Sequence, residues 1–374
     1  MPPAARGANR AYASTVRAAV GVIGLGTMGG AMAANLARNG YKVVGYDTVP
    51  ARRAQLKKAG GQPLASIAAV ARAAPFLITS LPSEAAVAAV MQELAAAGAK
   101  GRIVAEMSTM TLAVKEAARA VLAKAGLTLL DCPVSGTGRQ AAAQDLVVLA
   151  SGPAKAVKDF AAVFPGMSRS HHNVGPFGNG SKMKFVANLL VAIHNVSAAE
   201  AFVLGRKAGL DPEMVYRVIG DGAGASRIFQ VRGPMMVKGD YHVNPSVTNH
   251  IQQKDMRIIT DFARDLDCPT PMFNTSTPFY AAAIAMGHGE HDTASVCAVL
   301  EEWAGLGKTT RKAARPAAGG ATRAAAKGAA KPARAATQRI TEHTTKRSAK
   351  RTTQPAATHP AKRAATKSAA RKSA

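Results

Sequence analysis

Short apolar runs alternate with helical patterns over the first half of the chain. Runs rich in Val, Ile and Leu predict strands at AVGVIG, KVVGYD, PFLITSL, RIVAEMS, LTLLDCPV, DLVVLAS and SRSHHNV. Between them, alanine-rich segments such as SEAAVAAVMQEL carry apolar residues three and four positions apart, as amphipathic helices do. Strands that alternate with helices form βαβ units. Residues 18–178 are therefore predicted to form an α/β domain, a mostly parallel sheet with helices on both faces.

The pattern changes at residue 179. From there to residue 307 the periodicity is helical throughout, and it begins with the long segment KMKFVANLLVAIHNVSAAEAFVLGRKAG. This predicts a second, all-helical domain (179–307) attached through one long connecting helix. Residues 308–374 consist mainly of Ala, Lys, Arg, Thr and Pro. They hold too few large apolar side chains to bury a core, so a disordered tail is predicted.

The formal charge of +26 is concentrated in that tail. Residues 308–374 contain 18 Lys or Arg and one acid, whereas the other 307 residues contain 30 bases and 21 acids, a net charge of +9. The tail resembles the low-complexity tails of linker-histone-like proteins. Without aromatic residues it could neutralise phosphates but could not read a base sequence. We expect non-specific binding to nucleic acid or another polyanion, with a functionally idle extension as the alternative.

Cysteine usage and apolar runs bear on the compartment. The three cysteines are far apart and show no metal-ligand spacing, which favours a reducing compartment without a structural metal. No apolar run approaches the roughly 18 residues that span a bilayer. We therefore expect a cytoplasmic protein, with nucleoid association through the tail as an option. Residues 1–17 carry Arg and Ser without acids, as a mitochondrial presequence does, but are interpreted as a short N-terminal extension.

A glycine-rich motif joins the first predicted strand to the first predicted helix. The strand AVGVI runs directly into Gly24, Leu25, Gly26, Thr27, Met28 and Gly29. In such a turn the first glycine permits a tight bend, the second lets the backbone approach a pyrophosphate, and the third lets the helix pack on the strand. The following strand ends in an acid, Asp47, about 20 residues on, which makes the motif specific. This predicts a Rossmann-type NAD-binding domain.

The acid at the end of the second strand bears on cofactor choice. Asp47 can accept hydrogen bonds from the adenosine ribose hydroxyls, and its charge would repel a 2′-phosphate. NAD is therefore the expected cofactor. Arg52 and Arg53 follow in the next helix, where a long guanidinium could reach back to a phosphate, so NADP is the alternative.

Two lysines stand near the start of the long helix. Lys182 and Lys184 are separated by a rotation of roughly 200°, so they cannot both point into one cleft. Lys184 has Asn188 one turn further on its own face, whereas Lys182 is followed at those offsets by Phe185 and Val186. Lys184 thus lies on the polar face, where the helical domain leaves the sheet domain. Partial burial there would lower its pKa toward neutrality, as proton exchange requires.

Six segments in order resemble the 3-hydroxyisobutyrate dehydrogenase family of β-hydroxyacid dehydrogenases. They are GLGTMGGAMAANL, LPSEAAV, EMSTMT, DCPVSGTGRQAAAQDL, GNGSKMKFVAN and KDMRIITDFARDL. The resemblance covers Ala18 to about Gly305, and the segments GAGASRIFQVRGPMM and HDTASVCAVLEE are most similar to the branch that contains L-threonate dehydrogenases. It implies oxidation of the hydroxyl of a small hydroxycarboxylic acid, such as 3-hydroxyisobutyrate or a sugar acid, by hydride transfer to NAD.

The resemblance also implies roles for individual residues. Lys184 would be the acid/base, and Asn188 would hold the substrate oxygen. Further cofactor contacts would come from Leu81, Pro82, Thr109 and Lys254. The family normally has two asparagines after the catalytic lysine, and Ala187 occupies the first of these positions here.

The substrate carboxylate needs a loop that binds anions. Ser135, Gly136 and Thr137 follow a predicted strand, where successive backbone amides can form an anion-binding concavity. The family usually has a second glycine at the position of Thr137. Because a branched Cβ disfavours positive φ, a differently shaped loop is expected.

Two alternatives remain open for the function. The enzyme could run in reverse as a semialdehyde reductase of the tartronate semialdehyde type, or the chain could be a catalytically silent dinucleotide-binding protein tethered to nucleic acid. An imine reductase is disfavoured, because those enzymes usually replace the lysine. A metal at His288 and His291 is rejected, since no third ligand accompanies the pair. Apolar stretches such as NLLVAI and FYAAAIAM exceed what a small helical domain hides, which favours a homodimer or homotetramer.

Overall fold

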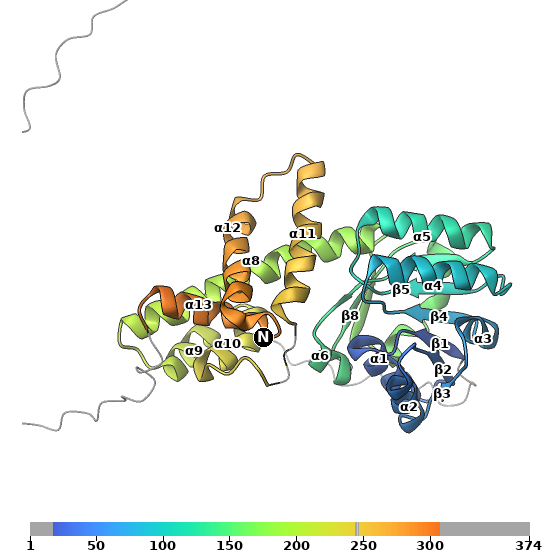
Figure 1. The fold of residues 1–374 in the computed structure, drawn as a ribbon, viewed down its shortest axis with the longest axis horizontal. Coiled ribbons are helices and arrows are strands. Elements are labelled where there is room, and N and C mark those ends of the chain that lie inside the picture. Colours follow the sequence, from blue (N-terminus) through green and yellow to red (C-terminus); the bar gives the residue numbers. More distant parts are fainter. Residues whose placement is uncertain (1–17, 244, 246, 307–374) are drawn as a thin grey trace, which may run out of the picture. The chain divides into compact units, whose positions relative to one another are not determined.

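The computed structural model describes residues 18–243, 245 and 247–306, so the predictions for the N-terminal extension and the basic tail fall outside it. The first part of the described chain contains a parallel sheet with strand order β3-β2-β1-β4-β5-β6 (Figure 1). Its strands are β1 (Val20–Ile23), β2 (Val43–Tyr46), β3 (Gln62–Pro63), β4 (Phe76–Thr79), β5 (Ile103–Glu106) and β6 (Thr128–Asp131).

The strand order reverses between β1 and β4. From β1 the chain builds outward to β2 and β3, then crosses to β4 on the other side of β1 and builds outward again. Because every pair is parallel, all strands end at the same edge of the sheet. In such sheets ligands bind outside the carboxyl ends of the strands, at the point of reversal. The topology thus gathers the loops after β1, β2, β4 and β5.

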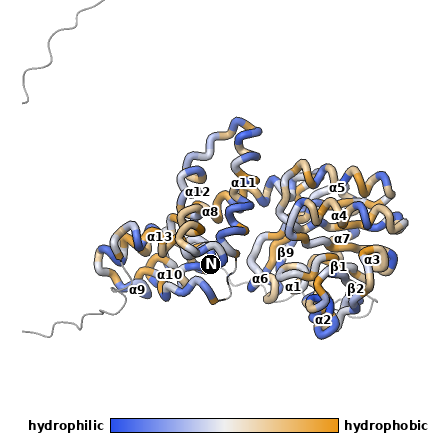
Figure 2. Tube along the Cα trace, in the orientation of Figure 1, coloured by the Kyte–Doolittle hydropathy of each residue, from blue (hydrophilic) through white to orange (hydrophobic). Residues whose placement is uncertain are grey.

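Helices cover both faces of this sheet. They are α1 (Thr27–Arg38), α2 (Pro50–Lys58), α3 (Ile67–Ala73), α4 (Glu84–Ala96), α5 (Leu112–Lys124), α6 (Gly138–Ala142) and α7 (Ala154–Phe160). Alternate strand residues enter different cores: in β4, Ile78 packs in the core that holds α1, α6 and α7, and Leu77 packs in the core that holds α3, α4 and α5. Burial on both faces explains the nearly continuous apolar strands. Figure 2 shows much of α2, by contrast, as hydrophilic.

The segment LTLLDCPV, predicted as one strand, is two. β6 ends at Asp131, and β7 (Val134–Ser135) belongs to a second sheet with β8 (Val147–Ala150) and β9 (Ser170–Asn173). The Cys132 amide still donates to the Glu106 carbonyl at 2.9 Å, but Pro133 has no N–H to continue the ladder. β7 then pairs antiparallel with β8. The two-residue β3 escaped prediction because so short a strand shows no periodicity.

The second part of the described chain is helical, as predicted. It comprises α8 (Asn179–Lys207), α9 (Pro212–Asp221), α10 (Arg227–Lys238), α11 (Asn249–Asp265), α12 (Pro271–Ala283), the π-helical turn η2 (Ile284–His288), the 3-10 turn η3 (Thr293–Ser295) and α13 (Val296–Trp303). Helices α9 to α13 all pack on α8 (Figure 1). The core that they share includes Phe185, Phe202 and Tyr280. The predicted fold class, a parallel Rossmann-type sheet followed by a helical domain, is confirmed.

Helix α8 has a length and composition that would also suit a membrane span. In the fold, 44% of its most apolar 18-residue window is buried, and five other helices pack on it. Part of its apolar surface thus forms the core of the helical domain, and length and composition alone are weak evidence for a span.

The first turn of α8 is pressed against the strand ends. A Cβ added at Gly180 would lie 2.6 Å from the carbonyl oxygens of both Asp131 and Leu149, and 3.0 Å from Pro133 Cδ. Backbone atoms cannot yield as a flexible side chain can. Only glycine therefore lets α8 begin this close to β6 and β8.

We expect Gly180→Ala to destabilise the protein by about 1–3 kcal/mol, because the added methyl overpacks a backbone contact. The matched control is Gly220→Ala in α9, where a Cβ would meet no atom within 4 Å. That change should stabilise by about 0.4–1 kcal/mol, because alanine lowers the entropy of the unfolded chain. Urea unfolding measures both. Equal changes in the free energy of unfolding for the two substitutions would show that the backbone around Gly180 can make room for a Cβ.

Candidate functional site

The three motif glycines differ in what surrounds them. Gly24 has φ +87°, and a Cβ there would lie 2.2 Å from the Ser80 carbonyl oxygen. A Cβ at Gly29 would lie 1.9 Å from the Gly24 oxygen, so this glycine allows α1 to pack on the strand. At Gly26 the nearest atoms belong to Arg52, 3.9 Å away. The open space at the middle glycine, at the start of α1, is the cradle that a pyrophosphate requires.

Asp47 is buried at the end of β2 and braces this turn. Its Oδ2 accepts from the Leu25 amide at 2.7 Å, and its Oδ1 accepts from the Val49 amide at 2.8 Å. Arg52 reaches the same carboxylate at 3.5 Å, and Arg53 donates to the Asp47 carbonyl oxygen at 2.5 Å. The acid predicted to bind ribose thus lies beside the glycine turn, but both arginines lie beside it too.

The loops after β4 and β5 are joined to each other and to the helical domain. The Leu81 amide donates to Ser108 Oγ at 2.8 Å, and Lys254 Nζ on α11 donates to the Thr109 carbonyl oxygen at 2.8 Å. The predicted cofactor residues Leu81, Pro82, Thr109 and Lys254 therefore come together around these two loops. Sequence reasoning overlooked Ser108, although it precedes Thr109 directly.

The loop after β7 differs from the expected amide concavity. Thr137 has φ −99° and caps α6: its Oγ1 accepts from the Gln140 amide at 3.3 Å, and its own amide donates to Gln140 Oε1 at 3.0 Å. The Thr137 amide is therefore already paired. The positive φ, +139°, falls on Gly136, so threonine is accommodated without strain at the following position. A Cβ at Gly138 would lie 2.6 Å from Thr27 Cγ2, which places this loop beside the glycine turn.

The two lysines of α8 lie in different environments. Lys184 is 8% exposed, whereas Lys182 is exposed, as expected from the rotation between them. Asn188, one turn beyond Lys184, donates to Asp255 Oδ2 at 2.9 Å, and Lys254 lies 3.1 Å from Asp255 Oδ1. Within the described part of the chain, no hydrogen bond or ion pair occupies the Lys184 amine. This buried amine is thus available to bind a substrate.

Burial lowers the pKa of Lys184 below the ordinary lysine value of 10.5. The Asp255 carboxylate opposes this shift and the Lys254 ammonium adds to it, but desolvation is the largest cause. Asp255 was not among the predicted residues. Its place directly after Lys254 was the only available signal, because its proximity to Lys184 depends on how α11 packs on α8.

The structure adds a third histidine to the rejected pair. His291 contacts His242 Nδ1 through Nε2 at 3.0 Å and His288 Nδ1 through its own Nδ1 at 2.7 Å. Because opposite nitrogens of His291 are engaged, the three rings do not converge on one point. Among the described residues, no group of three His, Cys, Asp or Glu side chains is arranged to hold a metal ion.

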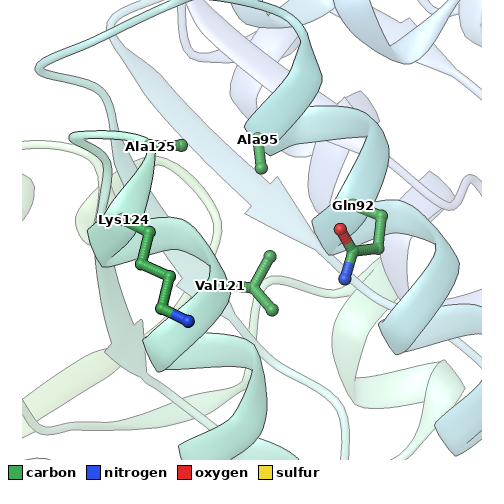
Figure 3. Close-up of a pocket in the computed structure, with 5 residues that line it drawn as sticks. All are labelled: Gln92, Ala95, Val121, Lys124 and Ala125. Carbon is green, nitrogen blue, oxygen red and sulfur yellow. The ribbon is translucent and has the colours of Figure 1, made fainter.

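A surface depression between α4 and α5 is lined by Gln92, Ala95, Val121, Lys124 and Ala125 (Figure 3). It lies on the outer side of two covering helices and includes none of the loops at the carboxyl ends of the strands. Its only polar side chains are Gln92 and Lys124, which have no acid or nucleophile beside them in the depression. It therefore offers no chemistry comparable to that around Lys184.

Comparisons with known proteins cover both parts of the chain. Residues 19–175 match the NAD-binding domain of 6-phosphogluconate dehydrogenase, and residues 178–300 match the NAD-binding domain of NADP-dependent 3-hydroxyisobutyrate dehydrogenase. The L-threonate dehydrogenase of Cupriavidus necator is 34% identical over 285 residues, which span 75% of this chain and 95% of that enzyme.

Two further relatives are 3-hydroxyisobutyrate dehydrogenases. The mitochondrial 3-hydroxyisobutyrate dehydrogenase of Homo sapiens is 31% identical over 299 residues, spanning 76% of this chain and 87% of that enzyme. The crystal structure of 3-hydroxyisobutyrate dehydrogenase from Salmonella typhimurium superposes with a TM-score of 0.68 at 30% identity, over 75% of this chain and 99% of that one. The chain therefore belongs to the 3-hydroxyisobutyrate dehydrogenase family of NAD(P)-dependent β-hydroxyacid dehydrogenases.

Proposed function

We propose that this enzyme oxidises the hydroxyl of a small hydroxycarboxylic acid with NAD, and that Lys184 is its acid/base. The observation that carries the proposal is a buried lysine amine, without a hydrogen-bond partner in the described chain, on the helix that begins at the carboxyl ends of the strands. A pKa lowered by burial lets that amine exchange a proton at working pH. The similarity to L-threonate and 3-hydroxyisobutyrate dehydrogenases supports the substrate class.

The residues around the cradle at Gly26 would hold the dinucleotide, whose nicotinamide supplies hydride acceptance when bound. Lys184 in its neutral form would take the proton of the substrate hydroxyl during oxidation. In the reverse direction its ammonium form would return that proton, which is the reduction that a semialdehyde reductase performs. Asn188, held by Asp255, would hold the substrate oxygen at this amine.

The substrate carboxylate would be gripped by the loop after β7. Because the Thr137 amide is paired with Gln140, Ser135 and Gly136 are the donors of this loop that we propose for the carboxylate. Thr137 would contribute by capping α6 and shaping the loop. The Cupriavidus necator relative makes an L-threonate-like sugar acid the first substrate to test.

Self-association is proposed on the strength of apolar surface. Met183, Val186 and Leu190 are each about half exposed along one side of α8. A second copy of the chain would cover such a stripe, in a homodimer or homotetramer. We propose a cytoplasmic location for the assembly.

Lys184→Ala should lower kcat for oxidation by at least about 100-fold, the usual contribution of a positioned acid/base. Lys182→Ala, an exposed lysine two residues away, is the control and should keep parental kcat. For the parent, kcat of oxidation should rise with pH as the amine loses its proton, level off below the 10.5 of an ordinary lysine, and show the opposite trend for reduction. NADH formation with L-threonate, 3-hydroxyisobutyrate and glycerate measures this. If Lys184→Ala keeps the parental kcat, Lys184 is not the acid/base.

Asp47→Asn should reduce the preference for NAD over NADP by about tenfold or more in kcat/KM, because the charge that repels a 2′-phosphate is lost. Arg52→Ala is the companion variant. Its guanidinium lies 3.5 Å from the Asp47 carboxylate and would pair with that phosphate, so its removal should weaken NADP use while sparing NAD. If the parent already has the higher kcat/KM with NADP, the arginines determine cofactor choice and the role given to Asp47 is wrong.

For residues 308–374 we propose a sequence-independent tether to nucleic acid or another polyanion, supported by their 18 Lys or Arg against one acid. Ending the chain after Gly307 should leave turnover unchanged and abolish most retention on DNA. Binding of the intact chain should weaken linearly in log affinity against log salt. Equal DNA binding by both chains at low salt would assign the binding to the other 307 residues, whose net charge is +9.

A further inference from the structure

Three charged side chains lie completely buried beneath the candidate site. They are Lys115 on α5, Glu106 at the end of β5 and Asp131 at the end of β6. Lys115 Nζ lies 3.0 Å from Asp131 Oδ1 and forms an ion pair with Glu106 Oε2. Burial by itself would lower the pKa of Lys115, but the two carboxylates outweigh it and raise this pKa. The two acidic side chains thus favour the ammonium form of Lys115.

Such a cluster is poor evidence for stability. Removing charges from water is costly, and well-packed apolar residues are often as stable as a buried ion pair. Buried ionic groups can instead specify one arrangement of the elements they join. The role of this cluster therefore depends on the contacts that Asp131 and Glu106 make in addition to Lys115.

Asp131 caps the helix that carries Lys184. Its Oδ2 accepts from the Ser181 amide at 2.7 Å, and its Oδ1 accepts from the Ser181 hydroxyl at 2.8 Å. Ser151 assists, because its hydroxyl accepts from the Gly180 amide at 3.0 Å and donates to the Asp131 carbonyl oxygen at 2.9 Å. The N-cap residue of α8, Gly178, offers no side chain for this purpose. The Asp131 carboxylate thus satisfies the Ser181 amide, Ser151 satisfies the Gly180 amide, and the negative charge faces the positive end of α8.

Glu106 holds the loops on the cofactor side. Its Oε1 accepts from the Ser108 amide at 3.0 Å, and the Ser108 hydroxyl in turn accepts from the Leu81 amide. The next residue, Thr109, receives the Lys254 ammonium on its carbonyl oxygen. One continuous set of contacts therefore runs from the loop after β4, through the cluster, to the first turn of α8.

We propose that Asp131 is a positioning residue for the dehydrogenase reaction, acting through its hydrogen bonds to Ser181 on the first turn of α8. Its effect is to hold the Lys184 amine at a defined place relative to the bound dinucleotide. The inference rests on the proposed role of Lys184 as acid/base.

The reach of this effect follows from helix geometry. Lys184 stands three residues after Ser181, within one turn on a neighbouring face. A rigid helix passes any displacement of its first turn directly to that amine. Displacement of a reacting group by about 1 Å can lower the rate of chemistry by about 100-fold. The dinucleotide cradle at Gly26 lies in a different loop and should be affected much less.

The test uses Ser181→Ala, which removes one hydrogen bond to Asp131, and Asp131→Asn, which removes its charge. We expect kcat to fall by about tenfold in the first and about 100-fold in the second. The affinity for NADH, from fluorescence titration, should stay within about twofold. The primary deuterium isotope effect with substrate deuterated at the reacting carbon should increase, because chemistry becomes more rate-limiting.

The matched control is Glu301→Gln, which breaks the buried Arg206–Glu301 ion pair inside the helical domain, away from the cluster. It should lower the melting temperature and leave kcat at 25 °C and the isotope effect unchanged. If Asp131→Asn does not fold, Ser181→Ala decides alone. Parental kcat in Ser181→Ala, or a loss of kcat accompanied by an equal loss of NADH affinity, overturns the inference.

Lys184→Ala separates this inference from the proposed function. If Lys184→Ala is inactive while Ser181→Ala and Asp131→Asn turn over like the parent, only the positioning role fails. If Lys184→Ala is active, the acid/base assignment fails first, and the positioning role fails with it.

Discussion

The first turn of α8 sits against the carboxyl ends of β6 and β8, and both the core of the helical domain and the place of Lys184 depend on that contact. It needs a residue without a side chain, Gly180, because two backbone carbonyl oxygens occupy the space that a Cβ would take. It also needs acceptors for the free amides of the helix: Asp131 accepts from the Ser181 amide, and Ser151 accepts from the Gly180 amide. Steric fit and charge thus act at the same turn, and the same helix becomes the support on which α9 to α13 pack.

Charge is buried twice near this turn, with opposite consequences. Lys115 is surrounded by Glu106 and Asp131 and keeps its proton firmly. Lys184 is also buried, and desolvation lowers its pKa; the Asp255 carboxylate only partly opposes this shift, and the Lys254 ammonium adds to it. Burial lowers the pKa of both amines, and the two carboxylates that pair with Lys115 reverse the direction of the shift there. In the proposed mechanism, Lys184 exchanges a proton, whereas Lys115 stays paired with Glu106 and Asp131.

The shape of the dinucleotide turn is also set by local steric requirements. Each of its glycines answers a separate requirement: a positive φ at Gly24, open space at Gly26, and close packing of helix on strand at Gly29. Asp47 ties the turn to β2, while Arg52 and Arg53 lie close enough to influence the phosphate end of the cofactor. Membership of an NAD(P)-dependent family follows from the chain as a whole, whereas the choice between NAD and NADP depends on these few side chains.

By itself the sequence determined the alternation of strands and helices followed by a helical domain, the dinucleotide motif, and the polar face of α8 that bears Lys184. These features are local: periodicity reports which residues share a face, and spacing reports which share a turn. Tertiary structure decided the break at Pro133 that begins a second sheet, the pairing of Asn188 with Asp255, and the cluster around Lys115. In the sequence Lys115 is indistinguishable from a surface lysine on an alanine-rich helix. Its partners are set by which strand ends meet, and such long-range contacts leave no periodic signal in the chain.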